Sequence, residues 1–166
     1  MPKRSAHLTA LVADPSSHMA ALVAVMLKSI DIRTVDATVD INNTAAELGR
    51  QAYGLILLDE QLGGREGFEM IRALRQNGNN PNRETPIIMM AAAPDAKMIA
   101  AARDAGVTEF LRKPFSAEHI KLRLDALKKA PRPFVEAASY VGPDRRRRTV
   151  AGAKTRRAAD KAASEG

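Results

Sequence analysis

The chain has 166 residues, of which 45% are hydrophobic, a length that accommodates one globular domain with an appended segment but not two full domains. The absence of cysteine excludes disulfide bonds, a thiol nucleophile and cysteine-ligated metal sites, and His7, His18 and His119 are too far apart for a local metal-binding motif. No apolar run approaches the roughly 20 residues of a membrane span, and no signal-peptide core follows Met1, so we expect a cytoplasmic protein without membrane insertion.

Most of the net charge of +7 lies near the C-terminus. Residues 1–130 carry 17 Lys and Arg against 15 Asp and Glu, a balance of +2, whereas residues 131–166 carry 9 against 4, a balance of +5. The C-terminal segment therefore favours an anionic partner.

Apolar strands and amphipathic helices are predicted to alternate from the start of the chain. A strand over 8–13 is followed by a helix that is capped at Ser16 and Ser17. A second strand over 33–36 is followed by a helix that opens with the capping-box pattern Thr44-x-x-Glu47. Helices between strands are what parallel pairing requires.

The same alternation continues through the next three strands, over 55–58, 87–91 and 109–111. The intervening helix after the fourth strand ends at Gly106, and the helix after the fifth is capped by Ser116. Five strand–helix units predict an α/β fold with a doubly wound, five-stranded parallel sheet.

Residues 131–166 lack this pattern. Pro131 and Pro133 interrupt regular structure, Arg145 to Arg148 form an unbroken cationic run, and the segment 149–163 is rich in Ala, Arg and Lys without an apolar stripe. We therefore expect residues 1–130 to form the domain and residues 131–166 to form a disordered, flexible, arginine-rich tail.

Charged residues follow three of the predicted strands at their carboxyl ends, where open parallel sheets gather ligands and chemistry. Asp14 follows the first strand, Asp59 the third and Lys113 the fifth. A pair of carboxylates can coordinate Mg²⁺, one of them can attack a phosphoryl group, and a lysine ammonium can neutralise the phosphoryl oxygens. These residue types predict an aspartyl-phosphate site.

Four segments resemble the CheY-type receiver domain of bacterial response regulators, over about residues 6–130. They are Leu11-Val-Ala-Asp14, Leu55-Ile-Leu-Leu-Asp59 with Gly67 eight residues later, Pro86-Ile-Ile-Met-Met, and Lys113-Pro-Phe. The resemblance implies a flavodoxin-like sheet with Asp59 as phospho-acceptor, Asp14 as the first residue of an acidic pair and Lys113 as the signalling lysine. It also implies that Phe110 is at the aromatic switch position and that the Lys113–Pro114 peptide is cis.

Three positions depart from the receiver pattern. Pro15 replaces the second acidic residue, which is a direct Mg²⁺ ligand in the family, Ala91 replaces the Ser or Thr that bonds the phosphoryl group, and Gly63 replaces a proline. The loss of a carboxylate leaves only a weak Mg²⁺ site at Asp14 and Asp59, and the loss of the hydroxyl uncouples phosphorylation from the switch. We therefore expect weak or absent phospho-signalling.

The segment Tyr140-Val-Gly-Pro-Asp144 precedes the arginine run and has side chains suited to guanine. Arginine pairs bidentately with the guanine O6/N7 edge or with phosphate, and tyrosine offers a stacking surface. A carboxylate at Asp144 can accept from guanine N1–H and the exocyclic amine, whereas it would be repelled by a DNA or lipid surface. Asp144 therefore favours a guanine nucleotide as the ligand.

A degenerate receiver followed by this segment resembles the Cle family, CheY-like effectors that bind cyclic di-GMP through an arginine-rich C-terminal segment and act on the bacterial flagellar motor. The resemblance implies a non-enzymatic protein whose ligand is cyclic di-GMP, whose partner is a flagellar motor switch protein and which is recruited to the flagellated pole. The ligand-binding residues it implies are Tyr140, Gly142, Pro143, Asp144, Arg145, Arg146, Arg147 and Arg148, with Arg156 and Arg157 as secondary contacts.

Two alternatives stay open at this point. A phosphorylation-dependent response regulator would accept phosphate on Asp59 from a histidine kinase. A nucleic-acid-binding protein would instead use the basic tail without regard to base, and its affinity would depend steeply on salt.

Overall fold

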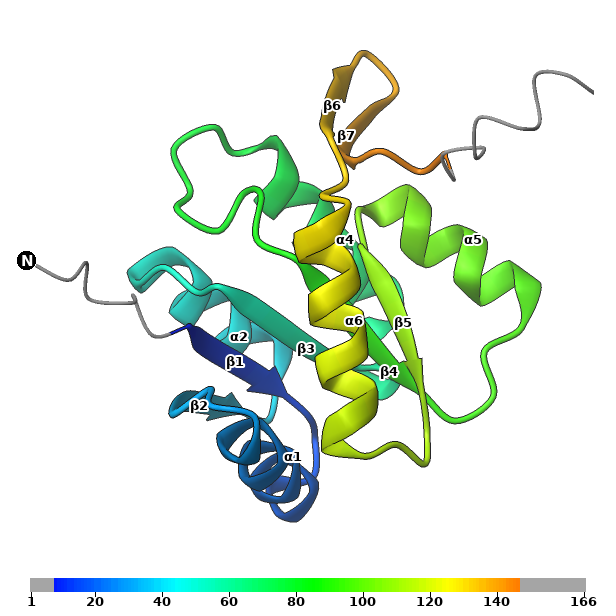
Figure 1. The fold of residues 1–166 in the computed structure, drawn as a ribbon. Coiled ribbons are helices and arrows are strands. Elements are labelled where there is room, and N and C mark those ends of the chain that lie inside the picture. The colour runs from blue at the N-terminus through cyan, green and yellow to red at the C-terminus, as the bar shows by residue number, and fades with distance from the viewer. Residues whose placement is uncertain (1–7, 147–166) are drawn as a thin grey trace, which may run out of the picture.

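A computed structural model of the protein describes residues 8–146 (Figure 1). Five parallel strands form one sheet in the spatial order β2-β1-β3-β4-β5, and two further strands form an antiparallel hairpin. The strands are β1 Thr9–Ala13, β2 Thr34–Thr38, β3 Leu55–Asp59, β4 Ile87–Ala91, β5 Glu109–Arg112, β6 Phe134–Ala137 and β7 Tyr140–Pro143. The helices are α1 Ser17–Ser29, α2 Ile41–Arg50, α3 Glu60–Gly63, α4 Arg65–Gln76, α5 Ala96–Ala105 and α6 Ala117–Lys129.

The sheet lies between two layers of helices, as a doubly wound fold requires (Figure 1). Alternate residues of β1 point to opposite faces: Ala10 and Val12 pack with buried residues of α1 and α6, whereas Leu11 and Ala13 pack with buried residues of α2, α4 and α5. Strands β1, β3 and β4 are almost entirely buried because helices cover both of their faces. The predicted fold class is confirmed.

The local expectations are confirmed in part. Helix α1 is capped by Ser16, whose hydroxyl accepts from Met19 N at 3.2 Å, and α5 ends at Gly106 with φ of 118°. The predicted capping box at Thr44 is wrong, because α2 begins at Ile41 behind an Asp40 cap. Thr44 is buried, and its hydroxyl donates to Asp40 O, so tertiary packing rather than capping explains this residue. A short helix, α3, was also not predicted.

Arg75 of α4 is a fully buried cation that joins three segments of the fold. Its guanidinium donates to Gly106 O at 2.9 Å, to Arg83 O at 2.6 Å and to Thr85 O at 2.8 Å. Burial lowers the pKa of Arg75 to about 10, so the side chain is still charged at neutral pH. A Cβ on Gly106 would lie 2.8 Å from Arg75 Cγ, which explains why glycine occupies this turn.

The expectation that residues 131–166 form a disordered tail is wrong for their first part. Residues 134–143 form the β6–β7 hairpin, in which Ala137 pairs with Tyr140. The hairpin lies at the amino-terminal end of the sheet, beside the ends of α4, α5 and α6 (Figure 1). Residues 147–166, which include Arg147, Arg148, Arg156 and Arg157, lie outside the described part of the chain.

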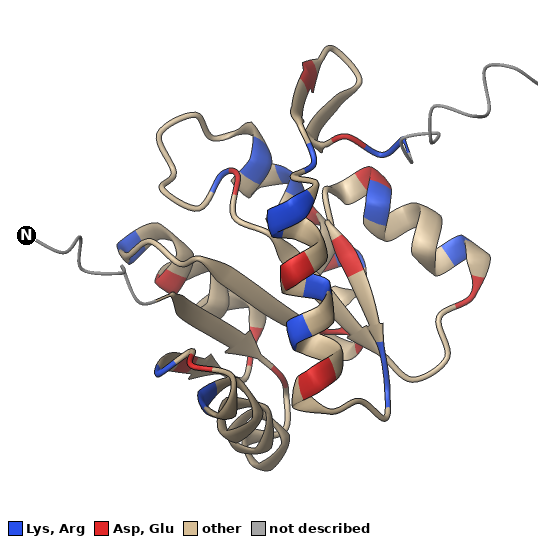
Figure 2. Ribbon diagram, in the orientation of Figure 1, with Lys and Arg blue, Asp and Glu red and all other residues tan. Residues whose placement is uncertain are grey.

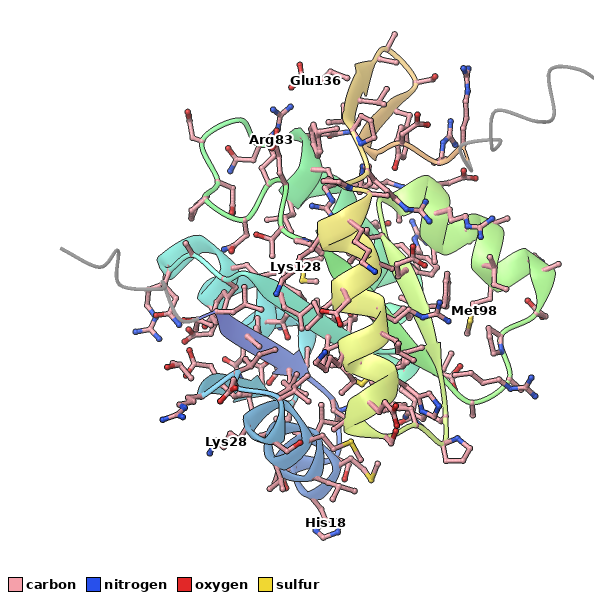
Figure 3. The ribbon with its side chains drawn as sticks, viewed as in Figure 1. His18, Lys28, Arg83, Met98, Lys128 and Glu136 are labelled. Atoms are coloured by element: carbon pink, nitrogen blue, oxygen red, sulfur yellow. The ribbon has the colours of Figure 1, made fainter. Side chains whose placement is uncertain are left out.

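Side chains from the domain hold the hairpin in place. Arg83 forms an ion pair with Glu136 at 2.5 Å, with the two side chains pointing toward one another, and its guanidinium lies 4.9 Å from the centre of the Phe134 ring (Figure 3). Arg132, in the linker, donates to Glu109 at 2.8 Å. Sequence periodicity cannot reveal these contacts, because the partners of Phe134 and Glu136 lie more than 40 residues away in the chain.

None of the helices within residues 8–146 combines the length and apolar character needed to cross a membrane.

The burial of Arg75 leads to a prediction about stability. The substitution Arg75→Met should lower the free energy of unfolding by about 3 kcal/mol, because two buried carbonyl groups and one partly buried carbonyl group lose their donors. Urea unfolding monitored by circular dichroism would measure the loss. The matched control is Arg72→Met, an exposed arginine of the same helix, which should change the free energy little. Equal effects of the two substitutions would contradict the role assigned to Arg75.

Candidate functional site

Asp59 is the last residue of β3, and the residues before it in the strand are all buried. This position places the Asp59 carboxylate at the carboxyl end of the sheet. The side chain is only 1% exposed, so its charge needs compensation by nearby donors. One oxygen, Oδ2, accepts from Gln61 N at 2.9 Å in the first turn of α3, and the other, Oδ1, forms an ion pair with Lys113 Nζ. Asp59 is therefore a buried carboxylate with donors at both oxygens.

Lys113 reaches Asp59 because β5 lies next to β4 in the parallel sheet. Ala91 at the end of β4 pairs with Arg112, and the N–H of Lys113 donates to Ala91 O at 2.8 Å. The Lys113–Pro114 peptide is cis, as the resemblance implied. The side chain of Lys113 is 26% exposed, so the ammonium group faces both Asp59 and solvent.

Asp14 lies beside Asp59, since Ala13 of β1 pairs with Leu58 of β3 and the two carboxylates follow at the same level. Asp14 is 3% exposed, and its Oδ1 accepts from Ser16 N at 2.8 Å. Strand pairing thus places all three charged residues at the same end of the sheet. The structure joins Lys113 to Asp59 by an ion pair and places Asp14 at the end of the neighbouring strand β1.

The residues at this edge can hold a magnesium ion, but with few protein ligands. Asp14 and Asp59 offer carboxylate oxygens, while Pro15 is exposed and has no side-chain donor atom. Within residues 8–146 no group of three or more His, Cys, Asp or Glu side chains is arranged around a common metal position. Mg²⁺ is commonly bound by one or two carboxylates together with water and substrate phosphates, so this donor set fits that minimal arrangement.

Ala91 places a buried methyl group at the end of β4, where the receiver pattern has a hydroxyl. The neighbouring Ala92 N–H donates to Glu60 Oε1 at 3.3 Å, a contact that joins the loop after β4 to the first residue of α3. Glu60 was not selected from the sequence. The only indication in the sequence was that Glu60 directly follows Asp59. That position does not show that the Glu60 side chain reaches the loop after β4.

The second predicted site lies at the opposite end of the sheet. Tyr140 is 8% exposed, its hydroxyl donates to Pro143 O at 2.6 Å, and burial raises the pKa of that phenol. Gly142 and Pro143 are also buried, and a Cβ on Gly142 would lie 2.6 Å from the Tyr140 hydroxyl. The buried part of the hairpin thus consists of Tyr140, Gly142 and Pro143. These residues do not form a free stacking surface for a ligand.

The hairpin is followed directly in the chain by Asp144, Arg145 and Arg146. The guanidinium of Arg145 lies 4.2 Å from the centre of the Tyr140 ring and forms an ion pair with Asp104 of α5 at 2.5 Å. The Asp144 carboxylate accepts from Arg146 N at 3.0 Å. Arg145 and Arg146 are exposed, so their charge is accessible to an anionic ligand.

The described part of the chain does not extend this charge into a broad basic surface. Figure 2 shows acidic and basic residues side by side along α5 and α6 rather than gathered on one face. A nonspecific nucleic-acid interface normally requires clustered Lys and Arg on one face, so the domain itself gives little support to that alternative.

Comparisons with known proteins agree with this geometry. The family model of the response regulator receiver domain matches residues 10–125. The transcriptional regulatory protein TcrA of Mycobacterium tuberculosis is 32% identical over 126 residues, which cover 74% of this chain and 48% of TcrA. The chain therefore spans about half the length of this curated relative.

Solved structures share the fold. Chemotaxis protein CheY4 of Vibrio cholerae matches with a TM-score of 0.65 at 23% identity, covering 73% of this chain and 98% of that chain. The receiver domain of the sensor histidine kinase PA1611 from Pseudomonas aeruginosa matches with a TM-score of 0.63 at 26% identity, covering 73% and 97% of the two chains. That structure has a magnesium ion coordinated in its active site cleft.

Proposed function

Because the chain belongs to the response regulator receiver domain family, we propose that it is a signalling protein whose Asp59 accepts a phosphoryl group from a phosphorylated histidine kinase. The observation that carries this proposal is the ion pair between the buried Asp59 carboxylate and Lys113, at the edge where three strands end. A carboxylate nucleophile with an ammonium group beside it is the arrangement that phosphoryl transfer requires.

The transfer needs no other nucleophile from the chain. A carboxylate oxygen of Asp59 forms a bond to phosphorus, and the bond from phosphorus to the donor breaks, with its electron pair remaining on the donor. Lys113 then shifts from the carboxylate toward the phosphoryl oxygens and offsets their charge. Magnesium, held by Asp14 and Asp59, would neutralise phosphoryl charge when bound. The chain acts in this scheme as a phosphate receiver rather than as an enzyme for an external substrate.

The departures at Pro15 and Ala91 reduce the efficiency of this scheme rather than remove its nucleophile. A site with one fewer carboxylate binds Mg²⁺ more weakly, so phosphorylation requires more of the ion. Without a hydroxyl at residue 91, the phosphoryl group lacks a direct hydrogen bond to the end of β4, which weakens its effect on that strand. We therefore propose a slow receiver with weak coupling between Asp59 and the rest of the fold.

Exposure to a small phosphoryl donor tests this function directly. Incubation of the full-length protein with acetyl phosphate and Mg²⁺ should add the mass of one phosphoryl group, and hydroxylamine should remove it, because the product is an acyl phosphate. Asp59→Asn should abolish the mass gain. The control Asp125→Asn, an ion-paired carboxylate on α6, should leave it unchanged. Equal labelling of Asp59→Asn and the wild type would refute the assignment.

A second candidate function is the binding of cyclic di-GMP by the segment that follows the hairpin. The observation that favours it is the packing of Arg145 against the face of Tyr140, with Arg146 exposed next to it. A guanidinium held over an aromatic ring has its orientation restricted and can pair with a guanine edge or a phosphate. In this candidate function, the ligand is contacted by Asp144, Arg145 and Arg146. The shape of the hairpin is determined by Tyr140, Gly142 and Pro143.

The rest of this candidate depends on the resemblance to the Cle family. A cyclic di-GMP effector of that kind would dock on a flagellar motor switch component and would be recruited to the flagellated pole. Arg147 and Arg148, with Arg156 and Arg157, would add contacts from the part of the chain that the structure does not describe. Nonspecific nucleic-acid binding is the remaining alternative for this segment.

Calorimetric titration separates these possibilities. Under the cyclic di-GMP hypothesis, Arg145→Ala should weaken binding of the dinucleotide at least about tenfold, since it removes one bidentate or stacked contact. Arg33→Ala, an exposed arginine before β2, is the control and should have no effect. GTP and a short DNA duplex serve as competitors. Displacement by the duplex with a steep salt dependence, or the absence of any binding heat, would contradict the hypothesis.

A further inference from the structure

Glu60 carries a negative charge into the edge where Asp59 would be phosphorylated. The residue begins α3 immediately after Asp59, and its Oε1 accepts from the N–H of Ala92 at 3.3 Å. Ala92 directly follows β4, whose residue Met90 pairs with Asp59 in the sheet. The contact therefore spans the gap between the carboxyl ends of β3 and β4, next to the proposed nucleophile.

The donors at this edge are already engaged by carboxylates of the chain. Ser16 N faces Asp14, Gln61 N faces Asp59, and Lys113 Nζ also faces Asp59. The fourth donor, Ala92 N, faces Glu60. An incoming phosphoryl group brings oxygens that need the same kinds of donor, because its charge is offset by N–H groups and an ammonium. Glu60 therefore holds a donor that the phosphoryl group would otherwise use.

The charges around Asp59 reinforce this competition. Asp14 and Asp59 are buried carboxylates at this edge, Lys113 is ion-paired with Asp59, and Glu60 follows Asp59 directly in the chain. Like charges repel each other, and this repulsion is screened less near buried groups than in bulk water. A dianionic phosphoryl group approaching Asp59 thus meets repulsion from Glu60 in addition to finding Ala92 N–H occupied.

An alternative role for Glu60 is to replace the magnesium ligand that is absent at Pro15. The geometry of the described residues opposes this role, because no three acidic or histidine side chains within residues 8–146 converge on a common metal position. The Glu60 carboxylate instead accepts from the N–H of Ala92, directly after β4. Competition with the phosphoryl group accounts for the contact between Glu60 and the Ala92 N–H.

We propose that Glu60 is an internal competitor of the phosphoryl group, a carboxylate that occupies the Ala92 N–H until phosphorylation of Asp59 displaces it. The inference deepens the proposed phospho-acceptor function and depends on it. Glu60 is a positioning residue in this scheme and takes no part in bond making. Its expected effect is to slow phosphorylation and to weaken the binding of phosphoryl mimics at Asp59.

Beryllofluoride, a tetrahedral mimic of the phosphoryl group, provides the test. The full-length, ¹⁵N-labelled protein would be titrated with beryllofluoride in the presence of Mg²⁺, and the amide signals of Gln61 and Ala92 would be followed. Glu60→Gln keeps the hydrogen bond to Ala92 N–H but removes the charge, and it should tighten binding about fivefold. Glu60→Ala removes both and should tighten binding further. Glu66→Gln, an exposed residue of α4, makes the same change in net charge and should leave the affinity unaltered.

The outcomes separate the inference from the function on which it depends. Tighter binding by both Glu60 variants, with Glu66→Gln equal to the wild type, supports the competition. If the Glu60 variants and Glu66→Gln bind beryllofluoride with the affinity of the wild type, the proposed competition is wrong, but the phospho-acceptor role of Asp59 stands. Weaker binding by Glu60→Gln, with a raised Mg²⁺ requirement, overturns it in favour of a metal ligand. If Asp59→Asn binds beryllofluoride as well as the wild type, or if no variant binds it, the phospho-acceptor function fails and the competition fails with it.

Discussion

The ion pair between Asp59 and Lys113 is the interaction on which the carboxyl edge of the sheet depends. Asp59 is almost completely buried, and a buried carboxylate is costly unless a cation or several N–H groups compensate it. Lys113 can reach it because β5 lies beside β4 and β4 beside β3, so the pair depends on the order β3-β4-β5 in the sheet. The ion pair thus links the fold to the chemistry proposed for Asp59.

The protein places its two candidate sites at opposite ends of the sheet. Asp59 and Lys113 lie at the carboxyl ends of the strands, whereas the hairpin with Arg145 lies at the amino-terminal end (Figure 1). Arg75 rigidifies the latter end by tying α4 to the segments that precede β4 and β5. Strands β4 and β5 begin next to the contacts of Arg75 and end next to Ala91 and Lys113, so both strands extend from one end to the other.

Much of the domain could be predicted from the sequence, because strands β1, β3 and β4 are mostly apolar runs and the helices have regular apolar spacing. Asp14, Asp59 and Lys113 could also be predicted to meet, since each follows a strand of one parallel sheet. The hairpin could not be predicted in this way. Pro131 and Pro133 suggested an irregular tail, and the contacts that order the hairpin come from Arg83 and Asp104, far away in the chain.

Two further features depend on tertiary structure that no local pattern contains. Thr44 has the spacing of a capping box, but burial against Thr38 places it inside α2 instead. Glu60 is adjacent to Asp59 in sequence, yet its significance arises only from the position of Ala92, 32 residues later. Contacts of side chains that reach between strands or loops therefore could not be predicted from local sequence patterns.

The coupling free energy between Asp59 and Lys113 tests most directly whether their ion pair organises the site. Free energies of unfolding would be measured in urea for the wild type, Asp59→Asn, Lys113→Met and the double variant. We predict that the two substitutions are not additive, with a favourable coupling of about 1 to 3 kcal/mol, because either single change leaves a partly buried charge without its partner. Additive effects, with a coupling near zero, would contradict the claim that this ion pair organises the site.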